Sequence, residues 1–401
     1  MRLPQGPLRS RNFRLLLACN VISLGGTAVA IVAIPFAVLA IGGSASDVGY
    51  VATASLVPVL IFLPLGGVVA DRLPRHQVMV AANALQALAQ AASAVLVLTS
   101  NARVWELMAL AAARGAGVSF YFPASMGLLP QTVPADQRAQ ANAIDRIGRN
   151  GAEIGGAALG GVLVGLAGPG WGLAADAASF AIAAVLRARM LFPALHQGPV
   201  TGMLHEMREG WRDFISRRWL WVIVLQFAFA VAITTATESV LGPLVAHTHL
   251  GGARSWGIIL AAYAAGAVLG GIVMLRFRPH RMLLAATLSV PSFSVFLFAL
   301  AVPLAVPLVA AAALLAGGCL EVFSVNWATT MQQEIPPAML SRLSSYDALG
   351  SLALSPAGTA AAGPLAATFG APAVLTTGGI LIVLLTAAVL FVPEVRHMQR
   401  R

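Results

Sequence analysis

The chain has 401 residues, of which 58% are hydrophobic and 10% charged, and its mean hydropathy is +0.83. Soluble globular domains are about 45–50% apolar and about 25% charged, so this composition excludes a soluble fold and indicates a protein of the lipid bilayer. The net charge is +10 and all 25 basic residues are arginine, so a P-loop nucleotide site and Schiff-base chemistry, which both need lysine, are excluded.

Twelve apolar stretches of membrane-spanning length follow one another along the chain. A spanning helix needs about 20 apolar residues. The sequence places such stretches at 14–41, 48–70, 78–99, 104–129, 141–167, 171–192, 219–246, 256–275, 282–303, 305–330, 344–368 and 372–392. We therefore predict an all-α polytopic membrane protein with twelve transmembrane helices, arranged as an N-terminal six-helix half at 1–192 and a C-terminal six-helix half at 219–401.

A polar linker at 193–218 joins the two predicted halves. Its apolar residues Met203, Met207, Trp211 and Phe214 fall at helical spacing, and charged residues occupy most of the positions between them. This pattern predicts an amphipathic helix at the cytoplasmic surface of the membrane. A plain connector between the halves is the expected role.

The arginines indicate how the chain crosses the membrane. With the N-terminus placed in the cytoplasm, 22 of the 25 arginines fall on the cytoplasmic side, Arg103 and Arg254 fall in outer loops, and Arg114 lies within a span. Cytoplasmic loops of membrane proteins carry an excess of basic residues. We therefore expect a multi-pass protein of the bacterial cytoplasmic (inner) membrane with both termini in the cytoplasm.

The two halves repeat one another at a nearly constant offset. Gly66 and Gly67 align with Gly270 and Gly271 when the first half is shifted by 204 residues. A shift of 202 residues aligns further pairs, which are Asp145 with Asp347, Gly148 with Gly350, Gly156 with Gly358, and Gly161 with Gly363. Two six-span halves repeated in parallel orientation are typical of one architecture of secondary transporters.

The loop after the second apolar stretch reads GVVADRLPRH. It resembles the signature of the major facilitator superfamily at this loop, Gly-x-x-x-Asp-Arg-x-Gly-Arg followed by a basic residue, although Pro74 stands where the family has glycine. The resemblance implies a cytoplasmic gate in which Gly67 allows close helix approach and Asp71, Arg72 and Arg75 make charge-assisted contacts. The alternative is a simple topological anchor.

Further segments, DAASF at 176–180 and EGWR at 209–212, resemble the drug- and siderophore-exporting branch of that superfamily, the enterobactin-exporter-like group. The fifth span departs from the antiporter pattern because it lacks the proline. The resemblance implies proton-coupled export of a small amphipathic molecule by alternating access, by a monomer that needs no cofactor beyond the proton gradient. Proton-coupled uptake of a small metabolite is the alternative.

A membrane-embedded lipid enzyme is disfavoured because the acidic residues are scattered over separate spans. The cysteines Cys19 and Cys319 lie in apolar stretches and the histidines form no ligand cluster, so we expect no metal site. Nucleic-acid binding is not expected either, because the arginines sit in short clusters between apolar stretches. The expected partners are the bilayer and a small-molecule substrate.

Charged side chains at bilayer depth are costly and mark function by default. Glu238 and Glu321 are predicted to bind a proton or a cationic substrate, because removal from water disfavours the charged form of a carboxylate. Arg114 is expected to pair with Glu153 or with an anionic substrate, and the resemblance links an arginine of the fourth span to proton coupling. Asp176 is expected to cap or anchor its helix near the outer edge.

In the resembled fold the first, fourth, seventh and tenth spans line a central cavity. Polar residues at spacings of three and four give each of these spans one polar face. The residues predicted to line the cavity are Asn20, Ser23, Thr27, Tyr121, Gln226 and Thr234.

Overall fold

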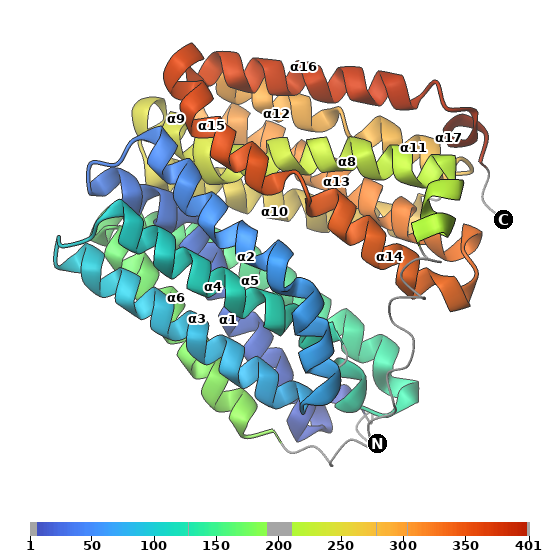
Figure 1. The fold of residues 1–401 in the computed structure, drawn as a ribbon, viewed down its shortest axis with the longest axis horizontal. Helices are drawn as coiled ribbons and strands as arrows, with labels where there is room; N and C mark the ends of the chain where they lie inside the picture. The colour runs from blue at the N-terminus through green and yellow to red at the C-terminus, as the bar shows by residue number, and fades with distance from the viewer. Residues whose placement is uncertain (1–5, 127, 191–210, 278, 303, 399–401) are drawn as a thin grey trace. The chain divides into compact units, whose positions relative to one another are not determined.

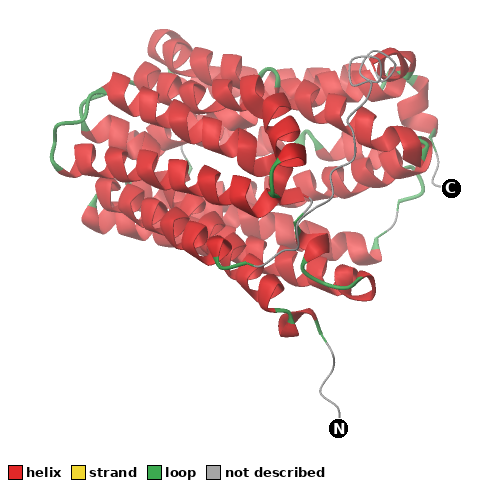
Figure 2. Ribbon diagram, turned by 60° about the horizontal axis from the view of Figure 1, so that its bottom comes forward, coloured by secondary structure: helices red, strands yellow, loops and turns green. Residues whose placement is uncertain are grey.

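The computed structural model describes residues 6–126, 128–190, 211–277, 279–302 and 304–398, and these are helices joined by short connections, with no strand among them (Figures 1 and 2). The chain divides into two compact units. The first unit is Met1–Gly198 with Gly251–Ala261, and the second is Pro199–Leu250 with Ala262–Arg401. The predicted boundaries at 192 and 218 stay predictions, because the linker up to 210 lies outside the described residues.

Six long helices form most of the first unit. They are α1 (Arg11–Ala40), α2 (Ala45–Arg72), α3 (Arg75–Leu98), α4 (Val104–Met126), α5 (Arg138–Ala167) and α6 (Pro169–Ala188). Helix α1 packs against α5 and α6, α2 packs against α4, and α3 packs against α4 and α6. Helix α2 begins with a capping box, in which Ser44 and Asp47 satisfy each other's backbone N–H groups.

The second unit contains both long helices and shorter helical pieces, and it includes α10 from Ala262 onward. The elements are α8 (Arg218–Ala236), the π-helical η4 (Thr237–Leu241), α9 (Gly242–His249), α10 (Ala253–Arg276), α11 (Met282–Ser289), α12 (Ser292–Ala301), α13 (Val306–Glu334), α14 (Pro337–Leu352), α15 (Ser355–Phe369), α16 (Ala371–Val389) and α17 (Pro393–His397). Helix α8 packs against α14, α15 and α16, while α13 packs against α11 and α12.

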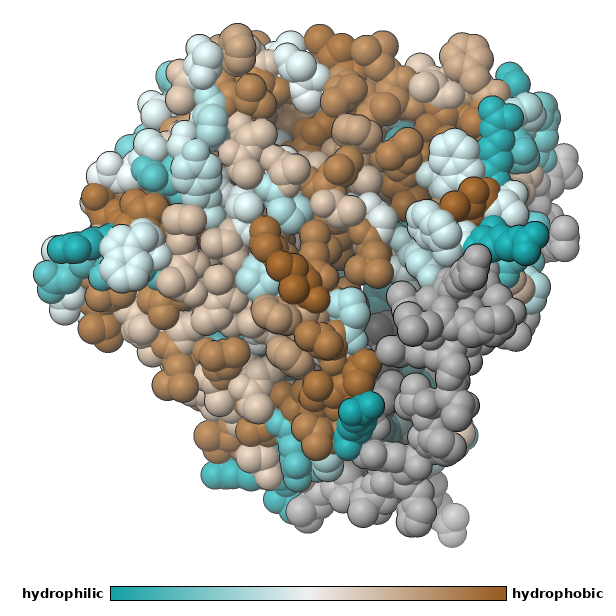
Figure 3. Space-filling model, viewed as in Figure 1, coloured by the Kyte–Doolittle hydropathy of each residue, from teal (hydrophilic) through white to brown (hydrophobic). Residues whose placement is uncertain are grey.

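The surface of the helices is that of a membrane protein. Among the described residues, ten helical stretches are long and apolar enough to cross a bilayer. The two further predicted spans correspond to α4, which contains Glu106 and Arg114, and to the shorter α14 and α15 in succession. Large apolar side chains such as Leu166 and Phe391 are 82% and 80% exposed. Hydrophobic residues cover much of the face in Figure 3. The prediction of an all-α fold with twelve spanning stretches is confirmed.

Three of the twelve stretches are interrupted, which the sequence analysis did not predict. The seventh passes through the π-helical η4, the ninth is divided between α11 and α12, and the eleventh is divided between α14 and α15. Pro291 lies between α11 and α12, and Pro356 lies in the first turn of α15. Proline has no N–H to donate and clashes with the preceding turn, so each divides a continuous helix.

Glycines confirm that the two halves repeat each other. Gly156 packs against Gly25 and Ala28 of α1, and its predicted equivalent Gly358 packs against Ala232 of α8. Such contacts let two helix backbones approach closely, because no side chain separates them. Each α5-like helix therefore meets the first helix of its own half in the same way.

The glycine that brings α2 close to α4 is Gly66, not Gly67 as the resemblance implied. A Cβ atom on Gly66 would collide with the carbonyl oxygen of Ser119 in α4, whereas a Cβ atom on Gly67 would meet no atom within 4 Å. Gly270, the equivalent of Gly66, lies against Gly318 of α13 in the same manner. Adjacent residues differ by about 100° around a helix, so only one of the pair can face the neighbouring helix.

The residues at 211–216, the part of the predicted linker helix that is described, are helical. Phe214 is 6% exposed, and its ring lies 5.9 Å from that of Tyr346 in α14. Trp211 stacks on Phe214 with 5.7 Å between ring centroids and stays half exposed. Phe214 therefore packs against α14, and the amphipathic helix predicted for the whole linker stays a prediction, because most of the linker lies outside the described residues.

Alanine at Gly66 should destabilise the protein, whereas alanine at Gly67 should be tolerated. The new methyl group of Gly66→Ala meets a backbone carbonyl that cannot move aside, and overpacking of this kind costs about 1–3 kcal/mol. Thermal unfolding of the purified variants in detergent measures the difference. Equal melting temperatures for Gly66→Ala and Gly67→Ala would contradict the assigned helix contact.

Candidate functional site

The π-helical segment η4 places Glu238 at the wall of a cavity in the second unit. A π turn holds one more residue per turn than an α-helix and occurs often at functional sites. The cavity has a volume of about 330 Å³. Its walls are formed by Phe227, Ala230, Val231, Thr234, Glu238, Tyr263, Ser289, Val290, Ser292, Phe293, Ala316, Leu320 and Phe323. These residues come from α8, η4, α10, the break between α11 and α12, and α13.

The polar groups of this cavity surround one carboxylate. Thr234, Ser289 and Ser292 each donate the hydroxyl proton to a carbonyl of the preceding turn, at 2.7–3.0 Å, so their oxygens stay available as acceptors. Tyr263 of α10 lines the same cavity as Glu238. Among the described residues, the structure gives the Glu238 carboxylate no hydrogen bond and no ion pair.

Aromatic rings form much of the remaining wall. Phe227 of α8 stacks on Phe323 of α13 with 4.5 Å between centroids and 6° between planes. Tyr263 of α10 meets Phe293 of α12 edge to face at 6.3 Å. A pocket with apolar walls and a few convergent polar groups is typical of small-molecule sites.

The structure places the two predicted neighbours of Glu238, Thr234 and Gln226, in different surroundings. Thr234 lines the same cavity, but Gln226 is 3% exposed and donates a hydrogen bond to Thr386 of α16 at 2.8 Å. Steps of four residues drift by about 40° each around a helix. Over the twelve residues from Gln226 to Glu238 this drift carries Gln226 to another face, where it joins α8 to α16.

Glu321 does not line the cavity. Its carboxylate oxygen Oε1 would lie 3.8 Å from a Cβ atom on Gly271, so it faces α10 within the α10–α13 interface. Gly317, one turn earlier, packs directly against the backbone of Tyr263. The polar face predicted for this span is therefore largely a packing face, and Glu321 stays a predicted proton-coupling residue.

A second and largely apolar groove lies against α8 and η4. It has a volume of about 660 Å³ and contains Ile233, Ala236, Thr237 and Leu241 of the same helical stretch, together with Phe229 and Ala232 of α8. Leu354 and residues of α12, α15 and α16 form the rest of its wall. The helical stretch that carries Glu238 thus borders both an acidic cavity and a largely apolar groove.

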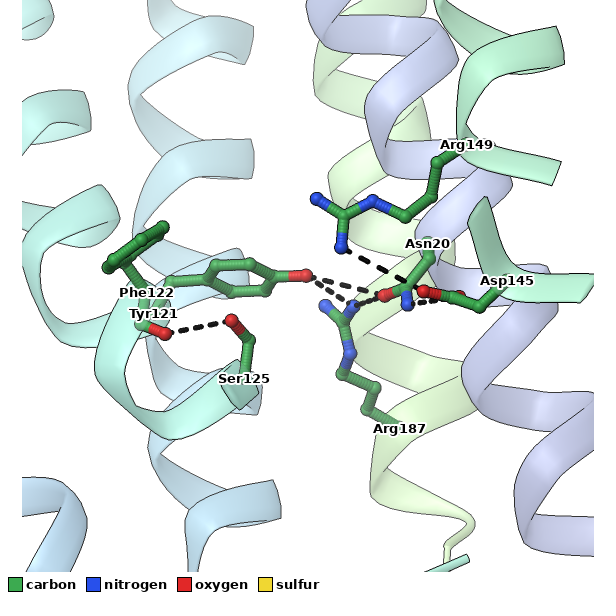
Figure 4. A network of polar contacts seen from close by, with 7 residues as sticks. All are labelled: Asn20, Tyr121, Phe122, Ser125, Asp145, Arg149 and Arg187. Atoms are coloured by element: carbon green, nitrogen blue, oxygen red, sulfur yellow. Dashed lines mark hydrogen bonds and ion pairs between the residues drawn. The ribbon is translucent and has the colours of Figure 1, made fainter. Parts of the chain in front are cut away.

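In the first unit, four helices meet at a buried polar network (Figure 4). Arg187 of α6 is fully buried and donates hydrogen bonds to Oδ1 of Asn20 at 2.8 Å and to the Tyr121 hydroxyl at 2.7 Å. Asn20 donates in turn to Asp145 of α5 at 2.8 Å, and Arg149 lies 3.8 Å from the same carboxylate. The guanidinium of Arg187 also lies 4.8 Å from the centroid of the Tyr121 ring.

This network brings together two predicted residues, Asn20 and Tyr121, and three that sequence reasoning missed as site residues, which are Arg187, Asp145 and Arg149. Arg187 was assigned to a cytoplasmic loop because it lies at the cytoplasmic end of a span. Asp145 was used only to align the halves. For Arg187 the signal that could have found it is its charge on the largely apolar helix α6. Asp145 lies in the polar first half of α5, where its charge does not distinguish it from its neighbours.

The other predicted residues of the first unit lie apart from this network. Ser23 is buried and Thr27 half-buried on α1. Glu153 is exposed on the surface of α5, and the charge that acts on it is that of Arg149. The charge of Arg114 acts on Asp176. The expected pairing of Arg114 with Glu153 is therefore wrong.

Of the predicted gate residues, Arg72 ends α2 with an exposed side chain and Arg75 begins α3 half-buried. The side chain of Asp71 lies outside the described residues. The described part of the chain contains no group of three histidine, cysteine or acidic residues that could hold a metal ion.

Known proteins resemble this chain over nearly its whole length. Residues 3–400 match the family described as transmembrane secretion effector. The multidrug efflux pump Tap of Mycolicibacterium fortuitum is 27% identical over 404 residues, which cover 96% of each protein.

Two solved structures show the same fold. The nucleoside transporter NupG gives a TM-score of 0.74 at 12% identity over 95% of this chain and 98% of its own. An inward-facing bacterial homologue of the human lysosomal transporter Spinster gives 0.70 at 16% identity over 99% of both. The chain therefore belongs to the transmembrane secretion effector family, as a multi-pass transporter of the major facilitator superfamily and not an enzyme.

Proposed function

We propose that this transporter exports small amphipathic cations in exchange for protons, and that Glu238 binds either the proton or the cation. The observation that carries the proposal is a carboxylate without a hydrogen-bonding or ion-pairing partner among the described residues, in a cavity walled by aromatic rings. The relative Tap is a multidrug efflux pump, which supports export rather than uptake.

The proposed coupling of proton and substrate follows from the free-energy cost of an unpaired charge on the Glu238 carboxylate. A carboxylate removed from water is costly unless it is neutralised, and in this cavity a proton or an organic cation can do so. Because the two compete for one group, release of the substrate requires a proton to arrive, and binding of the substrate expels it. The hydroxyl oxygens of Thr234, Ser289 and Ser292 orient a polar end, while the rings hold an apolar body.

Other predicted residues have structural and gating roles in this proposal. The network of Arg187 with Asn20 and Tyr121 ties the helices of the first unit together, and Arg72 and Arg75 act at a cytoplasmic gate. We place the protein in the bacterial cytoplasmic membrane, with both termini in the cytoplasm, as a monomer.

Glu238→Gln should abolish proton-coupled export, because an amide can neither release a proton nor attract a cation. Everted vesicles with a preformed proton gradient are given cationic, neutral and anionic amphipathic compounds, and the gradient is followed with a pH-sensitive dye. Wild-type vesicles should lose the gradient with cations, and Glu238→Gln vesicles should not.

Two further variants make this assay decisive. Glu394→Gln changes an exposed carboxylate of α17 and should behave as wild type, while Glu321→Gln asks whether the carboxylate at the α10–α13 interface is also needed. Full activity of inserted Glu238→Gln would disprove the assigned role. A wild-type response that raises the gradient instead of collapsing it would indicate uptake.

Phe227→Ala should weaken the binding of aromatic cations, because it removes an aromatic ring of the cavity wall that such a substrate can contact. A contact between two aromatic rings is worth about 0.5–1.5 kcal/mol, so loss of the contact between Phe227 and the substrate should raise the dissociation constant by roughly 2- to 12-fold. Phe229 lies two residues away on the same helix but lines the apolar groove, so Phe229→Ala is the matched control. Binding is measured by fluorescence titration of the purified protein, and equal effects of the two changes would disprove the assigned cavity.

A further inference from the structure

The largely apolar groove against α8 and η4 has no part in the export site proposed above. Among the described residues of its wall none is charged, and its side-chain hydrogen-bonding groups are the hydroxyls of Thr237 and Thr377. Thr237 is fully buried and donates its proton to the carbonyl of Ile233 at 2.7 Å. A charged or strongly polar ligand would therefore stay without partners in this groove, so its occupant must be apolar.

The groove is open on the side of α15 and α16. Ala357, Ala361, Leu365 and Phe369 belong to its wall and form an exposed stripe along α15 at steps of four residues. Leu365 and Phe369 are 42% and 67% exposed. Mostly hydrophobic residues cover the side of the molecule in Figure 3 where α15 and α16 lie in Figure 1. In a chain that spans the membrane, such an apolar surface faces the hydrocarbon of the bilayer.

The groove is long enough for one acyl chain. Its wall follows α15 from Leu354 to Phe369, which corresponds to about 22 Å at a rise of about 1.5 Å per residue. The hydrocarbon core of a bilayer is about 30 Å thick, and each leaflet contributes half of it. The groove ends beside Gly370, at the turn between α15 and α16. A chain whose headgroup lies at this turn can therefore fill the groove.

The corresponding helices of the first unit close on one another. A shift of 202 residues places α5 and α6 in register with α15 and α16. Gly160 of α5 packs against the backbone of Val29 in α1, and Gly172 of α6 lies against the side chain of Ala33 in α1. Glycine at these two positions thus lets the three helices approach closely.

Larger residues stand at the same positions of the second unit. Ala362 replaces Gly160 and Val374 replaces Gly172, and both line the groove. Beyond the contact at Gly358, their side chains keep α15 and α16 from closing on α8 as α5 and α6 close on α1. The groove is therefore a consequence of sequence differences between the two halves.

A third position adds space to the groove. Asp176 of α6 is fully buried, and its Oδ2 atom accepts a hydrogen bond from Nε2 of Gln90 in α3 at 2.6 Å. Asp176 thus lies inside the bundle, whereas the sequence analysis expected it to cap or anchor its helix near the outer edge. Its equivalent in α16 is Gly378, which lines the groove and has no side chain to fill it.

We propose that this groove binds one acyl chain of a phospholipid, supplied by the leaflet that contains the α15–α16 turn. Water does not suit the groove, because a buried water molecule needs two to four polar partners. An amphipathic cation does not suit it either, because the charge would stay unpaired. An empty groove would deprive its wall of dispersion contacts, so hydrocarbon of the surrounding bilayer fills it. This inference goes beyond the proposed function and does not depend on it.

The bound chain also supports the π-helical segment that carries Glu238. Ala236, Thr237 and Leu241, at the end of α8 and in η4, belong to the wall of the groove. An acyl chain gives these residues dispersion contacts that empty space does not. Local opening of a helix is rarer where more contacts must be broken. An occupied groove therefore slows the opening of η4.

Photo-crosslinking tests the proposed occupant. The full-length protein is reconstituted in vesicles of phosphatidylcholine that carries a diazirine in the middle of one acyl chain, without transport substrate. After irradiation and digestion, mass spectrometry locates the labelled residues. Label should concentrate on the groove wall around Ala361 and exceed the label around Leu159 of α5. Leu159 is the equivalent of Ala361, is 68% exposed, and reports ordinary contact with lipid.

Two groove-filling variants make the crosslinking decisive. Ala361→Trp and, from the other side, Thr377→Phe should each reduce the label on the wall to the level at Leu159, because both positions are exposed in the wall. Ala367→Trp changes an exposed position of α15 outside the wall and should keep the label. Label that is no higher on the wall than at Leu159, as expected for water or a second copy of the chain in the groove, would overturn the inference. Label that persists in both filled variants would do so too.

Hydrogen exchange tests the support of η4. Phosphatidylcholine added to the delipidated protein in detergent should slow amide exchange at Thr237–Leu241 in the wild type. It should have little effect in Ala361→Trp, whose ring already fills the groove. Equal slowing in the two proteins would contradict the support of η4 by the bound chain. Neither experiment uses a substrate or a proton gradient, so its outcome is separate from that of the export assay.

Discussion

In the hydrocarbon of a bilayer, every polar group must find its partner within the protein, because no water is available. This constraint explains why the chain consists of helices, whose backbone groups satisfy one another. Arg187, although fully buried, bonds to Asn20 and to Tyr121 through Nη2, whereas its Nε and Nη1 have no partner among the described residues. The carboxylate of Glu238 likewise has no hydrogen bond and no ion pair among the described residues, so side chains of the bundle satisfy its polar groups only in part.

The two halves share a backbone pattern but not a chemistry. Gly168 and Gly370, separated by 202 residues, both adopt a positive φ, of 92° and 82°, at the turns before α6 and α16. Only glycine takes up this conformation readily. Yet Asp145 accepts a hydrogen bond from Asn20, whereas its equivalent Asp347 accepts one from Trp327 at 3.0 Å. The repeat conserves the way in which helices pack and leaves the polar groups free to diverge.

The spans could be predicted from the sequence because hydropathy reports burial in lipid directly. The direction in which a single side chain points could not be predicted. Residues four apart in a helix differ by about 40° in direction, so over several turns they no longer share a face. This is why Thr234 reaches the cavity and Gln226 does not, and why Gly66 rather than Gly67 contacts α4.

Other parts of the candidate site depend on contacts that a sequence pattern does not contain. The arginine count places Arg187 at the cytoplasmic end of a span, but it does not say whether the side chain points outward or into the bundle. Tyr263 lies in an apolar stretch, and nothing in its sequence surroundings indicates that it lines the same cavity as an acid. Each residue became part of a site only because helices distant in the sequence lie beside it.

The π turn at Thr237–Leu241 contains one residue more than a regular α-helical turn. The position of this extra residue can move along the helix, one peptide unit at a time. Such a shift by one position would turn Glu238 by about 100° around the helix axis. The acid would then leave a wall that contains hydroxyl groups and approach the groove formed by Ala236 and Leu241. A single helical stretch could thus change the surroundings of its own carboxylate without tilting as a whole.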